Sequence, residues 1–343
     1  MLDRAVFIEP TYEDFLGDKL FDLTDANLNR DDQLLAAVRL KDAYARLGIP
    51  VHTADYLREG KVVARQNDYW SLGEAGKYQE LTHRSDVNLK AFIMLEPPLI
   101  QPATYRKLTE ICSNFQLTYL YNTERDQYTL PDELMGKVRK IYFPQPYETE
   151  VEPYWHRANR LNKLVVIAGN HNPRLKTPEY YSARIKAISE LVDLNAIDLF
   201  GRGWDKWWSP KSAWPTYWFN IRSIKNAYRG ACDSKLEVLS RYRFCLCFEN
   251  TPMRGYITEK IFDCLYAGVV PVYLGAPDIE KYIPEGVFVD MRKFSSYKEM
   301  FSYVESMSID DWQQKREAGK EFLRNDGNSD YVHFLDNISL ELE

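Results

Sequence analysis

The chain has 343 residues, a hydrophobic fraction of 45%, a formal net charge of −6 and an isoelectric point near 5.6. This length predicts two domains of ordinary size with a substantial core. The acidic balance argues against nucleic acid as the main partner, because affinity for a phosphate backbone comes from clustered Lys and Arg.

The N-terminal segment predicts a cytosolic protein. A strand-like run at residues 5–8 follows directly on the first four residues and is too short for a signal-peptide core. No apolar run approaches the roughly 20 residues of a membrane helix. A peripheral association with the inner membrane stays open.

The cysteines indicate reduced thiols. They are odd in number and contain no Cys-x-x-Cys pair, so neither a disulfide framework nor a zinc site is expected. The five are Cys112, Cys232, Cys245, Cys247 and Cys264.

Short apolar strands alternate with helical patterns through the first half, as in a parallel α/β sheet. Strands are predicted at residues 6–8, 51–52, 91–95 and 117–120, and helices at about 32–47 and 103–112. A polar, proline-containing stretch at residues 144–160 is typical of a linker.

The second half repeats this alternation. Strands are predicted at residues 164–167, 197–200, 243–248 and 269–274, and helices at 178–191, from 257 to Gly268, and at 310–324. We therefore predict an α/β protein with two Rossmann-like domains facing a cleft. The predicted domains are residues 1–155 and residues 156–343, the second including the helix at 310–324.

Residues 248–261 (FENTPMRGYITEKI) place ionisable side chains between a buried strand and a helix. The N-terminus of a helix carries a partial positive charge and unpaired N–H groups, so it favours an anion. Lys260, in the first turns of the predicted helix, strengthens that preference. A diphosphate is the expected ligand.

Phe-Glu-Asn followed by Tyr-x-Thr-Glu-Lys-Ile resembles the donor-binding motif of the α-1,3-fucosyltransferase family. Asn172-Pro173 with Ala183-Arg184-Ile185 resembles the family's Asn-Pro…Ala-Arg-Val stretch, and Leu95-Glu96-Pro97-Pro98 resembles its Met-Glu-Ser-Pro. The resemblance covers roughly residues 85–295. It implies the GT-B fold, with an acceptor-binding first domain and a donor-binding second domain, and inverting transfer of L-fucose from GDP-fucose.

Arg184 and Lys260 are the candidate diphosphate ligands. From its helical position alone, the expected role of Arg184 is to pack its stem over the helix edge. The family's matching Arg contacts the donor diphosphate, and with Lys260 it could neutralise the leaving group. No Asp-x-Asp, the motif with which other glycosyltransferases hold Mg²⁺ or Mn²⁺, occurs in the sequence, so no metal requirement is expected. The resemblance implies GDP-fucose as co-substrate and no further cofactor.

Four further residues complete the candidate donor site. The resemblance implies that Glu259 binds the ribose hydroxyls, although a first-turn Glu can also simply complement the helix dipole. Asn250 and Tyr256 match family positions that line the donor pocket, with loop capping as the alternative. Glu249 lies at the carboxyl end of a strand, where α/β sheets present ligand-binding residues. Its expected role is structural or electrostatic.

Glu96 is the candidate general base. Inverting transfer needs one base to take the proton of the acceptor hydroxyl, and the family's Glu at this position is its proposed base. The alternative is a surface Glu fixed by the turn at Pro97-Pro98. Leu99 and Ile100 follow where many family members have Ser-His, which puts the neighbouring acceptor contacts in doubt.

Five tryptophans crowd the segment between Gly203 and Phe219, where the resembled family is shorter. They could form a satellite core, a sugar-stacking wall or a subunit contact. The histidines show no metal-ligand spacing, so structural roles are expected. The five tryptophans are Trp204, Trp207, Trp208, Trp214 and Trp218.

The sequence therefore predicts a metal-independent fucosyltransferase of bacterial type, acting in surface-glycan synthesis. The expected partners are a GDP-sugar donor and a glycan acceptor containing N-acetylglucosamine or glucose. A membrane-surface glycolipid as acceptor and the oligomeric state stay open. The alternatives are transfer of another sugar, or a nucleotide- or carbohydrate-binding protein without turnover.

Overall fold

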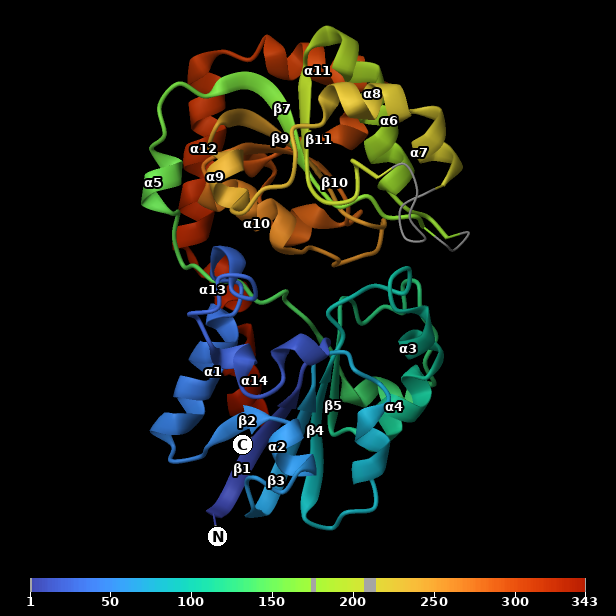
Figure 1. Ribbon diagram of the computed structural model, residues 1–343, viewed down its shortest axis with the longest axis vertical. Helices are drawn as coiled ribbons and strands as arrows, with labels where there is room; N and C mark the ends of the chain where they lie inside the picture. Colours follow the sequence, from blue (N-terminus) through green and yellow to red (C-terminus); the bar gives the residue numbers. More distant parts are fainter. Residues whose placement is uncertain (1, 174–176, 207–213, 343) are drawn as a thin grey trace. The chain divides into compact units, whose positions relative to one another are not determined.

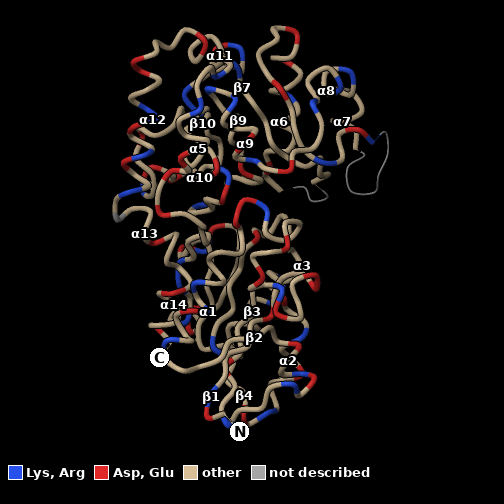
Figure 2. Tube along the Cα trace, turned by 60° about the vertical axis from the view of Figure 1, so that its left-hand side comes forward, with Lys and Arg blue, Asp and Glu red and all other residues tan. Residues whose placement is uncertain are grey.

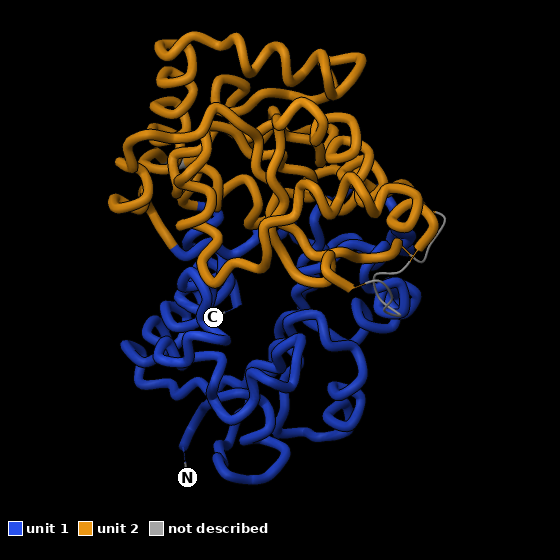
Figure 3. The backbone as a smooth tube through the Cα atoms, turned by 45° about the horizontal axis from the view of Figure 1, so that its top comes forward, with its two compact units in different colours: residues 1–146, 330–343 blue, residues 147–329 orange. Residues whose placement is uncertain are grey.

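The computed structural model describes residues 2–173, 177–206 and 214–342 (Figure 1). The chain forms two compact units (Figure 3): unit 1 is Met1–Pro146 with Asp330–Glu343, and unit 2 is Tyr147–Ser329. Each unit is a parallel sheet with helices, so the predicted α/β class with two Rossmann-like domains is confirmed.

Unit 1 contains a six-stranded parallel sheet of order β2-β1-β3-β4-β5-β6. The strands are β1 (Leu2–Glu9), β2 (Val51–Thr53), β3 (Ala64–Ser71), β4 (Val87–Ile93), β5 (Leu117–Leu120) and β6 (Val138–Lys140). The α-helices are α1 (Leu35–Arg46), α2 (Asp55–Arg58), α3 (Pro102–Arg106), α4 (Leu108–Asn114) and α14 (Phe334–Leu342). Short 3₁₀ turns are η1 (Glu13–Phe15), η2 (Lys19–Phe21), η3 (Arg30–Asp32), η4 (Lys77–Leu81) and η5 (Asp132–Lys137).

Strand β3 was missed from the sequence because its centre is polar. Asn67 and Asp68 are almost fully buried in it. Asp68 is satisfied by Arg4 Nε at 2.7 Å and by Asn88 Nδ2 at 2.9 Å, both from neighbouring strands. These partners offset the cost of burying a charge, so a strand without an apolar pattern occupies the middle of the sheet.

Unit 2 contains a five-stranded parallel sheet of order β11-β10-β9-β7-β8. The strands are β7 (Leu161–Ile167), β8 (Ile197–Phe200), β9 (Tyr242–Phe248), β10 (Val270–Leu274) and β11 (Val289–Asp290). The α-helices are α5 (Glu152–Trp155), α6 (Tyr181–Leu191), α7 (Pro215–Phe219), α8 (Ile221–Ala227), α9 (Lys235–Leu239), α10 (Glu259–Tyr266), α11 (Tyr297–Glu305) and α12 (Ile309–Arg324), with α13 (Asp326–Val332) spanning the boundary between the units. The 3₁₀ turns are η6 (Val192–Leu194), η7 (Ile279–Lys281), η8 (Glu285–Val287) and η9 (Met291–Lys293).

The connections of unit 2 determine where a ligand can bind. The chain leaves β7 through α6 to β8 on one side, then returns to β9 and proceeds through α10 to β10 on the other side. Parallel crossovers are right-handed, so α6 and α10 cover opposite faces of the sheet, as Figure 1 shows. The strand order therefore reverses between β7 and β9, and α/β sheets bind ligands at the carboxyl ends of such strands.

The observed division differs from the predicted boundary at residue 155. The chain enters unit 2 at residue 147, and the predicted linker packs there: Trp155 is buried, and Arg160 donates to the carbonyl oxygens of Tyr154 at 2.7 Å and Ala267 at 2.8 Å. Residues after 329 return to unit 1, where α14 packs against α1 and Lys90 Nζ donates to Leu342 O at 3.2 Å.

Figure 2 shows Lys and Arg interspersed with Asp and Glu in both units. Within the described part of the chain, no helix has both the length and the apolar composition that crossing a bilayer requires.

Candidate active site

The carboxyl end of β9 carries a fully buried carboxylate. Glu249 follows β9 directly, and its N–H donates to Leu274 O on β10 at 2.8 Å. Its side chain accepts from the backbone N–H of Thr258 at 2.9 Å and from the Thr258 hydroxyl at 2.8 Å. The Glu249 side chain therefore joins the end of β9 to the residue that precedes α10.

Lys260 compensates this buried charge. Its Nζ lies 3.0 Å from Glu249 Oε2, donates to Thr258 Oγ1 at 2.8 Å and lies 3.5 Å from Glu259 Oε1. Burial disfavours the ammonium, but the carboxylates of Glu249 and Glu259 outweigh it and raise the pKa of Lys260. Lys260 is therefore charged and held in one position, with 22% of its side chain exposed.

Glu259 lies at the first position of α10, with 36% of its side chain exposed. Burial would raise its pKa, but the ammonium groups of Lys260 and Lys235 and its own backbone N–H lower the pKa to about 2. Glu259 is thus an ionised hydrogen-bond acceptor at the start of the helix.

Arg184 reaches the same strand end from the opposite face of the sheet. It lies on α6, is 3% exposed and donates to Phe248 O at 2.7 Å. Its guanidinium also lies 5.5 Å from the centre of the Tyr181 ring. Burial lowers the pKa of Arg184, yet an Arg in this setting keeps its charge. Both cations predicted from the sequence therefore flank residues 248–249.

Asn250 and Tyr256 lie in the loop between β9 and α10. Asn250 Nδ2 donates to the Tyr256 hydroxyl at 3.2 Å, and Tyr256 is almost fully buried. Asn250 O accepts from the Tyr180 N–H at 3.0 Å, which attaches the loop to the start of α6. The turn at Gly255 has a φ of +66° and is fixed by an N–H bond to Asp278 Oδ1 at 2.8 Å.

A family model described as glycosyltransferase family 10 (fucosyltransferase), C-terminal, matches residues 165–316. These residues contain all six predicted donor-site side chains. Residues 165–316 therefore resemble the C-terminal domain of family 10 fucosyltransferases, and we refer to this segment as the family 10 domain. The resemblance that the sequence motifs indicated is confirmed for this part of the chain.

Two relatives carry short matching segments. The α-(1,3)-fucosyltransferase FucT of Helicobacter pylori is 38% identical over 82 residues, 24% of this chain and 17% of the relative. The α-(1,3)-fucosyltransferase 7 of Mus musculus is 46% identical over 76 residues, 21% of this chain and 20% of the relative. The matched part is thus about a fifth or less of each relative's length.

Solved structures share the fold. A sucrose-phosphate synthase from Thermosynechococcus elongatus matches with a TM-score of 0.59 and 11% identity, covering 99% of this chain and 97% of that one. The S. aureus protein TarM matches with a TM-score of 0.53 and 8% identity, covering 83% of this chain and 57% of that one. The predicted GT-B fold is confirmed.

Three residues of the family 10 domain that support the site were not singled out from the sequence. Thr258 binds the Glu249 carboxylate, and Asp278 fixes the turn of the loop. Gly275 follows β10, and a Cβ there would lie 2.6 Å from Glu249 Cγ. Thr258 stands inside the recognised motif and could have been predicted, whereas Asp278 and Gly275 become apparent only through the fold.

Glu96 belongs to unit 1, outside the family 10 domain. Strand β4 ends at Ile93, two residues before the predicted end at 95, so Glu96 lies in the following turn and is partly exposed. Two tyrosines hold this backbone: the buried Tyr121 donates through its hydroxyl to Leu95 O at 2.8 Å, and the half-buried Tyr105 donates to Glu96 O at 3.3 Å.

The tryptophan segment of the family 10 domain contains a satellite core. Trp204 and Trp214 are buried, and Trp204 Nε1 donates to Ala168 O at 2.6 Å while Trp214 Nε1 donates to Asn170 Oδ1 at 3.4 Å. Both acceptors follow β7. Trp218 is 43% exposed, and Trp207 and Trp208 lie outside the described residues.

The cysteines are thiols, and Cys245, Cys247 and Cys264 are buried beside one another in the family 10 domain. Among the described residues, no group of three or more His, Cys, Asp and Glu side chains is arranged to hold a metal ion.

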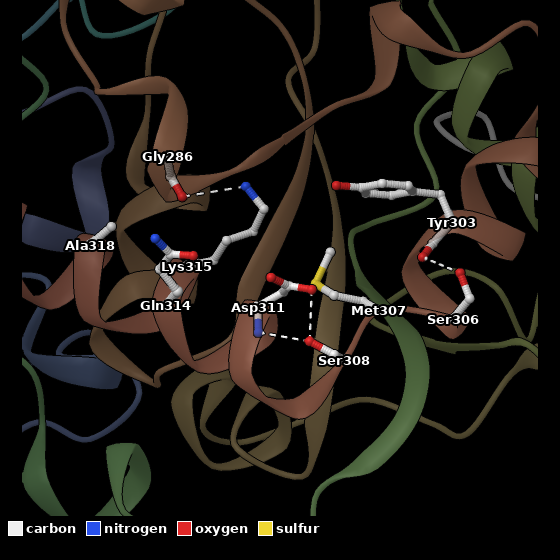
Figure 4. A pocket seen from close by; sticks show the side chains of 9 residues that line it. All are labelled: Gly286, Tyr303, Ser306, Met307, Ser308, Asp311, Gln314, Lys315 and Ala318. Atoms are coloured by element: carbon white, nitrogen blue, oxygen red, sulfur yellow. Dashed lines mark hydrogen bonds between the residues drawn. The ribbon is translucent and has the colours of Figure 1, made fainter.

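A cavity of about 490 Å³ lies in unit 2, and Figure 4 shows the side chains that line it. Gly286, which lines it, precedes β11, whereas Glu249 follows β9 in the same parallel sheet. Lys315 spans it and donates to Phe288 O at 3.2 Å. None of the predicted site residues lines this cavity, whose walls are Gly286, Tyr303, Ser306, Met307, Ser308, Asp311, Gln314, Lys315 and Ala318.

Proposed function

We propose that the protein is an inverting fucosyltransferase that moves L-fucose from GDP-fucose to a hydroxyl of a glycan acceptor, in an α-1,3 or α-1,4 linkage. The observation that carries the proposal is the ion pair between the buried Glu249 and the half-buried Lys260 at the start of α10, within the segment that matches family 10 fucosyltransferases. Two relatives that match 24% and 21% of this chain are named as an α-1,3- and an α-1,4-fucosyltransferase.

The pair has an electrostatic role in this proposal. Glu249 fixes Lys260 while itself remaining away from solvent, so the ammonium is positioned before any donor binds. A diphosphate at the start of α10 would meet Lys260, Arg184 and the helix N-terminus together. Such preorganised charge stabilises the negative charge that develops on a departing GDP.

The reaction breaks the bond between the fucose anomeric carbon and the diphosphate oxygen, and GDP leaves with the electron pair. The acceptor oxygen forms the new bond on the opposite face, and its proton passes to a base. Glu96 is the proposed base. Glu249 is poorly suited to that role, because it is fully buried and already accepts from Lys260 and Thr258.

The remaining donor contacts follow from the resemblance. The ionised Glu259 would accept hydrogen bonds from the ribose hydroxyls, and Asn250 with Tyr256 would line the pocket. Two fixed cations can perform the electrostatic work of a metal, which supports metal-independent transfer. We place this activity in bacterial surface-glycan synthesis, such as lipopolysaccharide or protein glycosylation, at the cytoplasmic face of the membrane.

A donor scan tests the proposal. Purified protein is mixed with GDP-fucose, GDP-mannose, UDP-glucose or UDP-N-acetylglucosamine, and the melting temperature is measured, since a specific ligand raises it by linkage. GDP-fucose should give the largest shift, and mass spectrometry should detect a fucosylated product from a panel of glycans containing N-acetylglucosamine or glucose. A larger shift with another donor would assign another sugar, and a GDP-fucose shift without product would indicate a binding protein.

A further inference from the structure

Unit 1 has its own binding edge at the carboxyl ends of its strands. Its strand order reverses between β1 and β3, because β2 lies on one side of β1 and β3 on the other. Parallel α/β sheets bind ligands outside the carboxyl ends of strands at such a reversal. β1 ends at Glu9, and the loop that follows it contains Tyr12.

Tyr12 is exposed although its neighbours are fixed. Its side chain is 58% exposed, whereas most tyrosines of unit 1 are buried. Thr11 donates through its hydroxyl to Leu72 O, just after β3. On the other side, Lys77 Nζ lies 3.1 Å from Glu13 Oε1 and 3.4 Å from Glu9 Oε1. The ring is thus attached to a backbone held on both sides, which lowers the entropic cost of using it as a contact surface.

The charge beneath this loop is neutralised. Glu9 is fully buried, and its carboxylate contacts both Arg58 and Lys77. Because the Glu9 carboxylate is buried and paired with these cations, it supports the loop and is not available to a ligand. Tyr12 is the aromatic member of the exposed residues 12–14 that follow β1, beside the exposed carboxylates of Glu13 and Asp14.

The ring lies near the candidate base. Partial burial and the Glu96 carboxylate both raise the pKa of the Tyr12 hydroxyl, so the two side chains interact. The strand order is consistent with this interaction. Only β3 separates β1 from β4, so the carboxyl ends of β1 and β4 lie two strand spacings, roughly 10 Å, apart. The side chains that follow β1 and β4 can bridge that distance.

We propose that Tyr12 is the platform on which the pyranose ring of the acceptor stacks, presenting one of its hydroxyls to Glu96. A pyranose has an apolar C–H face and a polar rim, and a Tyr beside a carboxylate complements both. This inference rests on the proposed function and adds to it a residue that recognises the acceptor.

Acceptor kinetics with Tyr12→Ala, Tyr12→Phe and Tyr303→Ala test the platform. N-acetyllactosamine and the same glycan panel serve as acceptors, and GDP affinity is measured by calorimetry. Tyr12→Ala should raise the acceptor KM on the order of tenfold with kcat and GDP affinity little changed. Tyr12→Phe keeps the ring and should stay within about twofold of the wild type. Tyr303→Ala removes another exposed tyrosine, 47% accessible, and should have no effect.

The outcomes separate the two proposals. An unchanged acceptor KM in Tyr12→Ala overturns the platform, as does a wild type that binds GDP-fucose but transfers to none of the glycans. A wild type that binds no GDP-fucose contradicts the proposed function instead. If Tyr12→Ala does not fold, a tenfold rise in KM for Tyr12→Phe would show that the hydroxyl, rather than the stacked ring, recognises the acceptor.

Discussion

The carboxyl edges of the two sheets are built differently. In unit 2, the buried Glu249 pairs with the half-buried Lys260, and Arg184 reaches the same strand end from the other face. In unit 1, the groups at that edge, Tyr12 and Glu96, are at least partly exposed. The family 10 match covers the first edge and not the second.

The difference fits two kinds of ligand. A diphosphate has a fixed charge and geometry, so a rigid arrangement of cations suits it and depends closely on residue type. A sugar acceptor is neutral and varied, so an exposed ring with a nearby carboxylate can be changed without loss of the donor site. The predictions below separate these two edges.

The largest effect is expected at the edge of unit 1. Glu96→Gln keeps the shape of the side chain but cannot accept the proton, so turnover should fall on the order of 10²–10⁴-fold. Donor affinity, measured by calorimetry with GDP, should persist. Glu133→Gln, an exposed carboxyl of η5, serves as the control. Near-normal turnover in Glu96→Gln would exclude this residue as the base.

A smaller effect is expected at the edge of unit 2. Arg184→Ala removes a charge-assisted contact on the order of 1.5–3 kcal/mol, so GDP should bind roughly 10- to 100-fold more weakly. The acceptor KM should change little. Arg241→Ala provides a matched control, because Arg241 pairs with Glu237 on the surface. Equal GDP affinity in the two folded variants would remove Arg184 from the donor site.

The acid stability of unit 2 should depend on Glu259. Its folded-state pKa of about 2 lies below the ordinary 4.5, so its contribution is fully present above about pH 4.5 and is lost as the pH falls toward 2. Because the side chain is 36% exposed, we expect only about 1 kcal/mol after solvent screening. Urea unfolding at several pH values gives the free energy of unfolding as a function of pH. Below about pH 4.5 this free energy should fall less steeply for Glu259→Gln than for the wild type. Identical curves would contradict the lowered pKa of Glu259.

Chelation should have the smallest effect. If Lys260 and Arg184 stabilise the leaving diphosphate, transfer should continue in EDTA at the untreated rate. Loss of turnover that Mg²⁺ or Mn²⁺ alone restores would show that the two cations are insufficient.

The sequence predicted the strands and the helix at the carboxyl edge of unit 2 well, because their signals are local. The strands at 243–248 and 269–274 and the helix between them were found within a residue or two, since apolar runs and the motif lie close together in the chain. The helix at 310–324 was likewise confirmed.

The features that sequence reasoning missed depend on distant partners. Strand β3 is polar and is stabilised by side chains of neighbouring strands, such as Arg4. The return of α14 to unit 1 depends on its packing against α1, almost 300 residues earlier in the chain. Tyr12 lies in no recognisable sequence motif. Only its exposure and its interaction with Glu96 in the structure make it a candidate binding residue.

The most direct test of the central claim is a GDP titration that separates the ammonium of Lys260 from its buried partner. Lys260→Gln alone would leave the buried Glu249 carboxylate without a cationic partner, at a cost of several kcal/mol. The Lys260→Gln change is therefore tested in a Glu249→Gln background. Glu249→Gln should bind GDP at least as well as the wild type, because the ammonium remains. Adding Lys260→Gln should weaken GDP binding roughly 10- to 100-fold. Equal affinity of the single and double variants, both folded, would contradict the claim that Lys260 holds the diphosphate.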